Sequence, residues 1–241
     1  MSVRYKYEIH PDFAALQPLV VSLPDAFNSF GEIIYEGRNT LRRGRAEGHD
    51  LVIKSFKPPH IINRAAYTFF RPSKAERSFR YASILLQKDI PTPRPAAFFE
   101  EFRNGLLYAS YYVSLYSGHP RNMREFWFDP EIGGRAPILK DFACFTAKLH
   151  DAGVLHLDYS AGNILFDHNE AGTRFHLVDI NRMRFGTVSE EEGYRNFRRL
   201  WLPVHTYDQI AEAYAEACGY DKKHAVERVR YYKDRFMSKK R

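Results

Sequence analysis

The chain of 241 residues is long enough for one large domain or for two lobes that share a cleft. With 44% hydrophobic and 15% aromatic residues it is too apolar to stay disordered, and no apolar run reaches the roughly 18 residues that span a bilayer. A formal net charge of +7 favours an anionic partner but does not choose among nucleic acid, a phosphate-rich substrate and an acidic membrane face.

Short β-branched or aromatic runs with turn signals between them fill most of the first half of the chain. They are residues 31–37, 40–46, 50–56, 95–102 and 106–115. Tight turns such as A-E-G-H-D and R-N-G join neighbouring strands, so we expect an antiparallel sheet. One helix interrupts it, from Ser73 to about Lys88, and the prolines of D-I-P-T-P-R-P end it. Its predicted apolar stripe is Ala75, Phe79, Ala82, Leu85 and Leu86.

The second half is mainly helical. A helix is predicted over 137–153, followed by two short strands at 163–167 and 175–180 that a polar turn joins. Three further helices are predicted at 189–201, 207–217 and 224–236. The predicted fold class is therefore α+β. A β-rich lobe of residues 1–115 precedes a helical lobe of residues 116–241.

Two features bear on the compartment. The N-terminal run M-S-V-R-Y-K-Y-E-I-H lacks the apolar core of a signal peptide, so we expect a cytoplasmic protein. Cys144 and Cys218 lie far apart in helical runs with no C-x-x-C pair, and we expect both to be buried, reduced thiols.

The run V-L-H-L-D-Y-S-A-G-N-I-L, residues 154–165, carries the strongest chemical signal. His156, Asp158 and Asn163 reproduce the spacing of the kinase catalytic loop H-R-D-x-x-x-x-N. In that loop the Asp accepts the proton of the substrate hydroxyl and the Asn holds a Mg²⁺ ion. Taken singly, Asp158 or Asn163 is equally suited to cap a turn and His156 to lie in a core. Together, between two apolar runs, they predict a phosphotransferase.

A second acidic residue follows at Asp179, in H-L-V-D-I-N-R, where a kinase carries D-F-G. Phosphoryl transfer needs a second protein contact to the metal that neutralises the nucleotide phosphates, so Asp179 is the second candidate metal ligand. Ile180 and Asn181 replace the Phe and Gly, which argues against the Phe-packing switch of regulated protein kinases. A turn-forming Asp at a strand end is the alternative.

The nucleotide-phosphate contact is predicted at Lys54, in L-V-I-K, with Lys57 in reserve. Strand alternation puts Val52 and Lys54 on one face. Glu76 is the candidate helix partner of that lysine, although Ser73-x-x-Glu76 is equally a capping box.

The glycine-rich phosphate loop is reduced to Y-E-G-R-N-T-L. Gly37 stands where a G-x-G-x-x-G would lie, and Arg38 or Asn39 is expected to contact phosphate instead of a full backbone cradle. By itself this stretch reads as a turn.

With these residues placed, the chain resembles the lipopolysaccharide kinase family, whose bacterial members phosphorylate Kdo or heptose sugars of the lipopolysaccharide inner core. The resemblance covers nearly the whole chain and rests on five segments: Y-E-G-R-N-T-L, I-K-S-F-K-P-P-H-I-I-N-R-A-A-Y-T-F-F-R, P-T-P-R-P, L-H-D-A-G-V-L-H-L-D-Y-S-A-G-N-I-L and V-D-I-N-R-M-R-F-G. It implies a two-lobed, protein-kinase-like fold with ATP and Mg²⁺ as cofactors. It also implies Asp158 as the base, Asn163 and Asp179 as metal ligands and Lys54 as the phosphate contact. The implied acceptor is a sugar hydroxyl on a lipopolysaccharide or lipid A-core glycolipid, at the cytoplasmic face of the inner membrane.

Other functions stay open at this point. Phosphorylation of a soluble small molecule, as in choline- or aminoglycoside-kinase relatives, is the nearest alternative. A protein kinase is disfavoured because residues 180–188 are too few for a peptide-binding activation loop and no A-P-E motif follows. A non-catalytic nucleotide-binding scaffold conflicts with the intact Asp158, Asn163 and Asp179. No nucleic acid partner is expected, since no recognition motif accompanies the charge.

Two basic segments predict peripheral contact with an anionic membrane face. From Lys222 to Arg241 there are nine Lys or Arg residues against Glu227 and Asp234. From Leu51 to Ala75 there are five against no carboxylate, and residues 57–71 mix cations with aromatic and aliphatic side chains as an interfacial helix does. A solvated helix face and a basic tail are the alternatives.

Overall fold

The computed structural model describes residues 2–58, 71–128 and 132–239, so most of the 57–71 segment and the last two residues lie outside the described residues. The chain divides into two compact units, each described by itself: unit 1 is Met1–Asp89 with Pro93–Ser117, and unit 2 is Ile90–Thr92 with Gly118–Arg241. Residues 90–92, expected in the first lobe, belong to unit 2. The reason is that the Leu177 N–H donates to the Pro91 carbonyl, and the Thr92 hydroxyl donates to the Leu177 carbonyl at 2.7 Å.

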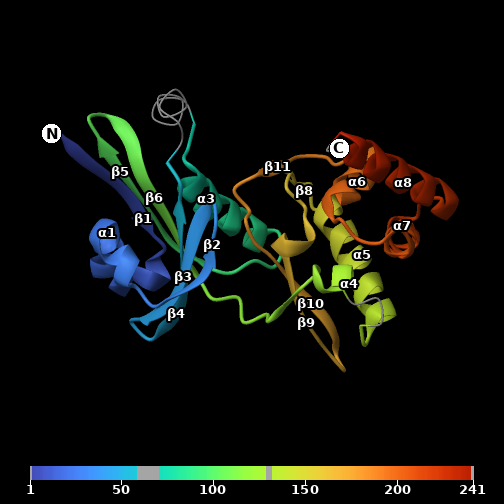
Figure 1. Cartoon of the computed structure of the whole chain (residues 1–241), viewed down its shortest axis with the longest axis horizontal. Helices are drawn as coiled ribbons and strands as arrows, with labels where there is room; N and C mark the ends of the chain where they lie inside the picture. Colours follow the sequence, from blue (N-terminus) through green and yellow to red (C-terminus); the bar gives the residue numbers. More distant parts are fainter. Residues whose placement is uncertain (1, 59–70, 129–131, 240–241) are drawn as a thin grey trace. The chain divides into compact units, whose positions relative to one another are not determined.

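Unit 1 is built on a six-stranded antiparallel sheet with the order β1-β5-β6-β4-β3-β2 (Figure 1). Its strands are β1 (Val3–Ile9), β2 (Glu32–Glu36), β3 (Asn39–Ala46), β4 (His49–Phe56), β5 (Pro95–Arg103) and β6 (Leu106–Leu115). The five predicted strands match β2 to β6 to within one residue at each end. The edge strand β1 was not predicted.

Two helices cover opposite faces of this sheet (Figure 1). The successive residues Phe98 and Phe99 of β5 point to opposite faces, as strand geometry requires. Phe99 packs in a core with Val20 and Leu23 of α1 (Gln17–Ala26), a helix that the sequence patterns did not predict. On the other side, Phe98 packs with Phe79 of α3 (Lys74–Gln87).

Helix α3 begins where predicted, because the Ser73 hydroxyl accepts the Glu76 N–H at 3.1 Å and caps the helix. Ala75, Phe79, Ala82 and Leu85 are buried as the apolar stripe predicts. Leu86 is 36% exposed, so its place in the stripe was wrong. It follows Leu85 directly, about 100° further around the helix, and points away from the sheet.

Unit 2 combines helices with two small sheets, one of order β10-β9-β7 and one that pairs β11 with β8. Its helices are α4 (Glu125–Phe128), α5 (Arg135–Asp151), α6 (Glu190–Asn196), α7 (Val204–Cys218) and α8 (Lys222–Ser238), with 3-10 turns η3 (Ala161–Asn163) and η4 (Phe197–Arg199). Its strands are β7 (Arg121–Asn122), β8 (Val154–His156), β9 (Ile164–Asn169), β10 (Gly172–Leu177) and β11 (Met183–Phe185). Helix α5 packs against β10 and α7, and α7 packs against α8 (Figure 1).

The observed elements confirm the predicted α+β fold class. The expectation that both cysteines are buried was wrong, because Cys144 is exposed and Cys218 half-buried. Cys144 lies on the outer face of α5, whose inner face buries Leu139, Phe142 and Ala143. None of the helices in the described ranges is long and apolar enough to cross a membrane.

Candidate functional site

Backbone and side-chain hydrogen bonds hold the loop from Leu157 to Asn163 in unit 2. The Ser160 N–H donates to the Asp158 carbonyl at 2.8 Å, and the Asn163 N–H donates to the Ser160 carbonyl at 2.9 Å. The Asn163 side-chain amide reaches back to the same Asp158 carbonyl at 2.9 Å. The candidate base and the candidate metal ligand therefore belong to one closed hydrogen-bonded loop.

His156 fixes this loop from inside the core. It is fully buried, its Nδ1 accepts the Asp158 N–H at 3.1 Å, and its Nε2 lies 3.2 Å from the Val178 carbonyl. A carbonyl only accepts, so Nε2 carries the proton and Nδ1 does not. Burial, the largest influence, lowers the pKa of His156, which keeps the ring neutral. His156 thus ties the Asp158 backbone to the strand end that precedes Asp179.

Asn163 and Asp179 leave the same end of the β9–β10 hairpin. Ile164 pairs with Leu177 at that end, and the Val178 N–H donates to the Asn163 carbonyl at 3.0 Å. Antiparallel pairing therefore brings together two candidate ligands that are 16 positions apart in the sequence.

The backbone of Asp179 is strained. Its φ is +54°, in the left-handed region that side chains other than glycine avoid, and the Asn181 amide donates to its Oδ1 at 2.6 Å. Strained residues of this kind persist where the surrounding structure holds them, and they cluster at functional sites.

The carboxylate of Asp158 is partly exposed and faces two arginines that the sequence reading missed. Arg199 Nη1 lies 3.2 Å from Oδ1, and Arg182 Nη1 lies 3.7 Å from Oδ2. Arg182 belongs to the quoted V-D-I-N-R run, so proximity to Asp179 was a usable signal. No spacing rule points to Arg199, because only the packing of unit 2 brings it to the loop.

The donor set suits a hard divalent cation that retains other ligands. Asn163 uses its amide nitrogen for Asp158, which leaves its side-chain oxygen to accept or ligate, and Asp179 adds a carboxylate. Within the part of the chain that the structure describes, no cluster of three or more His, Cys, Asp or Glu residues is arranged to hold a metal. One amide oxygen and one carboxylate fit Mg²⁺, which binds through few protein ligands together with water and substrate phosphates.

The remaining candidates lie in unit 1. Lys54 is on β4, where it pairs with Tyr112 of β6 and Leu41 of β3, and its Nζ lies 5.1 Å from the centre of the Phe56 ring. Leu51 and Ile53 are buried while Val52 and Lys54 are half-buried, in keeping with the predicted division of faces. The phosphate contact of Lys54 stays a prediction.

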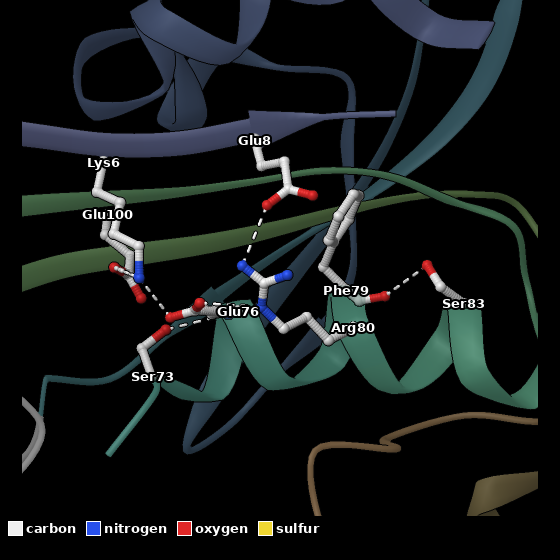
Figure 2. A network of polar contacts seen from close by, with 8 residues as sticks. All are labelled: Lys6, Glu8, Ser73, Glu76, Phe79, Arg80, Ser83 and Glu100. Atoms are coloured by element: carbon white, nitrogen blue, oxygen red, sulfur yellow. Dashed lines mark hydrogen bonds and ion pairs between the residues drawn. The ribbon is translucent and has the colours of Figure 1, made fainter. Parts of the chain in front are cut away.

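Glu76 lies on α3 in a network of charged groups (Figure 2). Its Oε2 accepts from Lys6 Nζ of β1 at 2.6 Å, and its Oε1 accepts from Arg80 Nε at 3.0 Å. Burial by itself raises the pKa of Glu76, but these two hydrogen bonds outweigh it and the pKa lies below its usual range. Ser73 caps the helix, but the Glu76 side chain bonds Lys6 and Arg80 and does not complete a capping box. The pairing of Glu76 with Lys54 stays a prediction.

Gly37 and Arg38 form the turn from β2 into β3, and Asn39 is the first residue of β3. A Cβ at Gly37 would lie 2.7 Å from the Tyr35 hydroxyl, so any larger residue displaces that ring. The Asn39 side-chain oxygen accepts the Lys57 N–H at 3.3 Å, which occupies it and ties the turn to the segment after β4. Arg38 is exposed. Phosphate contact by these residues stays a prediction.

The fold is that of a solved structure described as "WaaP in complex with acyl carrier protein". The two chains superpose with a TM-score of 0.65 at 13% identity, over 97% of this chain and 98% of the other. Identity this low shows a shared fold alone.

The sequence comparison is more specific. Residues 59–215 match the family described as "Lipopolysaccharide kinase (Kdo/WaaP) family", and the chain belongs to this family. It is 33% identical over 122 residues to the 3-deoxy-D-manno-octulosonic acid kinase of Xanthomonas campestris pv. campestris (strain B100), which is 51% of this chain and 46% of the relative. The corresponding kinase of Stenotrophomonas maltophilia (strain R551-3) is 32% identical over 124 residues, with the same shares. The chain thus spans about half the length of the curated relatives it matches.

Proposed function

We propose that the chain is a kinase that uses ATP and Mg²⁺ to phosphorylate a sugar hydroxyl of the lipopolysaccharide inner core, on Kdo or heptose. Membership of the family and the names of the matched relatives support this acceptor. The single observation that carries the proposal is the hydrogen-bonded set of His156, Asp158 and Asn163, with Asp179 at the adjoining hairpin end.

Each residue of the set has a role in the proposed reaction. The acceptor hydroxyl oxygen bonds to the γ-phosphorus of ATP, ADP departs, and the Asp158 carboxylate takes the hydroxyl proton. His156 keeps the Asp158 backbone in place, since it holds that N–H in the core. Asn163 and Asp179 would hold Mg²⁺, which neutralises charge on the phosphates. Lys54 contacts the nucleotide phosphates, and Glu76, Gly37, Arg38 and Asn39 stay candidates for supporting that contact.

The test is transfer of labelled γ-phosphate from ATP to a panel of acceptors. The panel holds Kdo-bearing lipid A, a heptose-bearing core oligosaccharide, free sugars and a peptide. We expect transfer to one of the inner-core acceptors, and Asp158→Ala should lower kcat by on the order of 10²–10⁴. Asp167→Ala is the matched control, because Asp167 is a carboxylate of unit 2 that pairs with Arg174 at 3.0 Å on the β9–β10 hairpin.

Two results would count against the proposal. Parent protein that transfers phosphate only to a soluble sugar or amino alcohol supports the small-molecule alternative. Unchanged turnover of Asp158→Ala removes this residue from the mechanism.

We further propose that the protein works in the cytoplasm, at the anionic inner face of the inner membrane, where the proposed glycolipid acceptor would be met. The net charge of +7 supports this location. Part of the charge on α8 is compensated within unit 2, because Lys222 pairs with Glu216, Arg228 with Glu191 and Arg230 with Asp208. Membrane attraction therefore has to come from other cations of the chain.

A further inference from the structure

Two guanidinium groups flank the Asp158 carboxylate, which engages only part of their N–H donors. Arg182 Nη1 is 3.7 Å from the carboxylate, too far for a hydrogen bond, and the Arg182 side chain is 50% exposed. Arg199 Nη1 lies 3.2 Å from Asp158 and also approaches the Leu157 carbonyl at 3.4 Å. Each guanidinium carries five N–H donors, so both retain donors for a further anion.

Other parts of unit 2 contact both arginines. The Leu157 N–H donates to the Arg182 carbonyl at 2.9 Å, which places Arg182 beside the residue that precedes Asp158. The Arg199 guanidinium lies 5.6 Å from the centre of the Phe236 ring of α8, within the range of a cation–π contact. The backbone thus places Arg182 next to the loop, and helix packing holds the Arg199 guanidinium beside Asp158.

Several other arginines of unit 2 lie close to these two in the sequence. Arg195, Arg198 and Arg199 lie within five positions, and burial together with these neighbours lowers the pKa of Arg198. Glu192 is the carboxylate that Arg184 and Arg195 approach, at 2.8 and 3.8 Å. Asp158 and Glu192 are thus each approached by two arginines, so arginines outnumber carboxylates in these ion pairs.

An aromatic residue adjoins the same cluster. The Trp201 ring packs edge-on against Phe236 at 5.5 Å between ring centres, and its side chain is 37% exposed. Its φ of +60° is unusual for so bulky a residue, and the Trp201 N–H donates to the Tyr207 hydroxyl at 2.9 Å. Trp201 gives the cluster an apolar neighbour of the kind on which a sugar ring can lie.

We propose that Arg182 and Arg199 bind a carboxylate of the acceptor, so that the acceptor is a sugar acid held beside Asp158. This inference rests on the proposed function, in which Asp158 receives the hydroxyl proton. Paired arginines recognise carboxylates through planar, two-point hydrogen bonds. The matched relatives are named as kinases of an octulosonic acid, which is a sugar acid of this class.

The experiment compares two soluble probes by equilibrium binding without nucleotide. One is a deacylated, Kdo-terminated lipid A oligosaccharide, and the other is the same molecule with the Kdo carboxyl reduced to an alcohol. We expect the parent to bind the acid about 10- to 100-fold more tightly, since a charge-assisted hydrogen bond is lost in the alcohol. Arg182→Gln and Arg199→Gln should each lose most of that preference. Arg174→Gln is the control, because Arg174 is an exposed arginine of unit 2 that pairs with Asp167.

The outcomes separate the inference from the proposed function. Equal binding of acid and alcohol by the parent, or a preference that both Gln variants keep, overturns the inference whether or not phosphate is transferred. A parent that prefers the acid through these arginines but transfers no phosphate to it supports the inference and contradicts the proposed function. Arg182→Lys and Arg199→Lys, with part of the preference restored, distinguish lost recognition from misfolding.

Discussion

Asp179 joins three unusual properties in one residue: a left-handed backbone, a short hydrogen bond from Asn181, and a place at the same hairpin end as Asn163. A residue with positive φ costs about 1–2 kcal/mol relative to glycine. Strained residues cluster at functional sites, so this geometry supports the hypothesis that the Asp179 carboxylate binds the metal.

Two substitutions at this position separate folding from metal binding. Asp179→Gly relieves the left-handed strain but loses the hydrogen bond from Asn181, so the free energy of unfolding should change by no more than about 1 kcal/mol. Asp179→Asn keeps the shape of the side chain and removes its charge. Both variants should need more Mg²⁺ to reach half of their maximal transfer rate. Thermal unfolding and Mg²⁺ titration measure the two effects, and an Asp179→Asn protein that titrates like the parent rules out the metal role.

The candidate site was predictable at the residue scale only where the chain is locally continuous. His156, Asp158 and Asn163 lie within eight positions, so their spacing alone indicates one loop. Arg199 and Lys6 have no such signal. Arg199 reaches Asp158 across 41 positions and Lys6 reaches Glu76 across 70, and only tertiary packing determines those contacts.

The network at Glu76 joins two secondary-structure elements, because Lys6 of β1 bonds to Glu76 of α3 on one face of the unit 1 sheet (Figure 2). The Glu76 side chain is 8% exposed and its Lys6 partner 45% exposed, so solvent weakens the pair without removing it. Because the pKa of Glu76 is lowered in the folded state, the stabilisation is present above the unfolded pKa of about 4.3 and is lost as pH falls through the folded value.

Lys6→Met tests this contact. The variant should lower the free energy of unfolding at pH 7 by about 1 kcal/mol, and the difference from the parent should shrink below about pH 4. Urea unfolding at several pH values measures it. Arg4→Met is the matched control: Arg4 also lies on β1, two residues away on the same face, and its guanidinium lies 4.5 Å from the centre of the Phe102 ring. Equal effects of the two variants at every pH would contradict a specific bond to Glu76.

His150 connects three helices of unit 2. It lies near the end of α5, its Nε2 is 3.2 Å from the Asn196 amide at the end of α6, and its Nδ1 is 2.9 Å from the Tyr214 hydroxyl of α7. The amide donates to Nε2, so Nδ1 carries the proton. Burial lowers the pKa of His150 to about 4, so the folded protein keeps this ring neutral where the unfolded chain protonates it.

The lowered pKa of His150 makes the stability of the folded protein depend on pH. Between the ordinary histidine pKa of about 6.5 and the folded value the unfolded state binds more protons, so the parent loses stability as pH falls. His150→Gln should be less stable than the parent at pH 7, because it loses packing between the helices. The difference should narrow by up to about 3 kcal/mol as pH approaches 4. If the free energies of unfolding of the two proteins changed with pH in the same way, the pKa of His150 would not be lowered in the folded state.

Local patterns were enough to predict most of the strands and helices. Strands β2 to β6 have β-branched or aromatic runs with turns between them, and helix α5 has Pro137 near its start and Gly153 just after its end. Strand β1 does alternate apolar and polar residues, over V-R-Y-K-Y-E-I, a strand signal that the prediction did not use. Helix α1 contains Pro24, which local rules read as a break, and packing of Val20 and Leu23 on the sheet overrides it.

Charge is a property of the whole molecule. The +7 excess should attract the protein to acidic vesicles, with about 1 kcal/mol from each well-placed Lys or Arg. Replacement of Lys239, Lys240 and Arg241 by Gln should weaken sedimentation with such vesicles, and the loss should shrink with added salt because screening acts within about 10 Å at 0.1 M. Lys240 and Arg241 lie outside the described residues, so this rests on the sequence.

The control for this experiment removes three positive charges elsewhere. Arg4, Arg103 and Arg174 replaced by Gln give the same net charge as the tail variant, and all three are exposed positions of the described chain. Equal losses for the two triple variants would show that net charge alone drives binding. Binding that neither variant nor salt reduces would leave the tail as solubilising charge and favour a soluble acceptor.

The register of the outer strand pair has a consequence for how unit 1 is made. In that pair Ile9 meets Ala97 and Val3 meets Arg103, so the two partners are separated by most of the unit. At a ribosomal rate of about 5–20 residues per second, β1 waits on the order of 5–20 s for β5 to be synthesised. Until then its backbone donors and acceptors, and the Lys6 ammonium that later meets α3, have no native partner. Unit 1 therefore completes its sheet late, by a long-range closure of the kind that slows folding and leaves a strand open to association with other nascent chains.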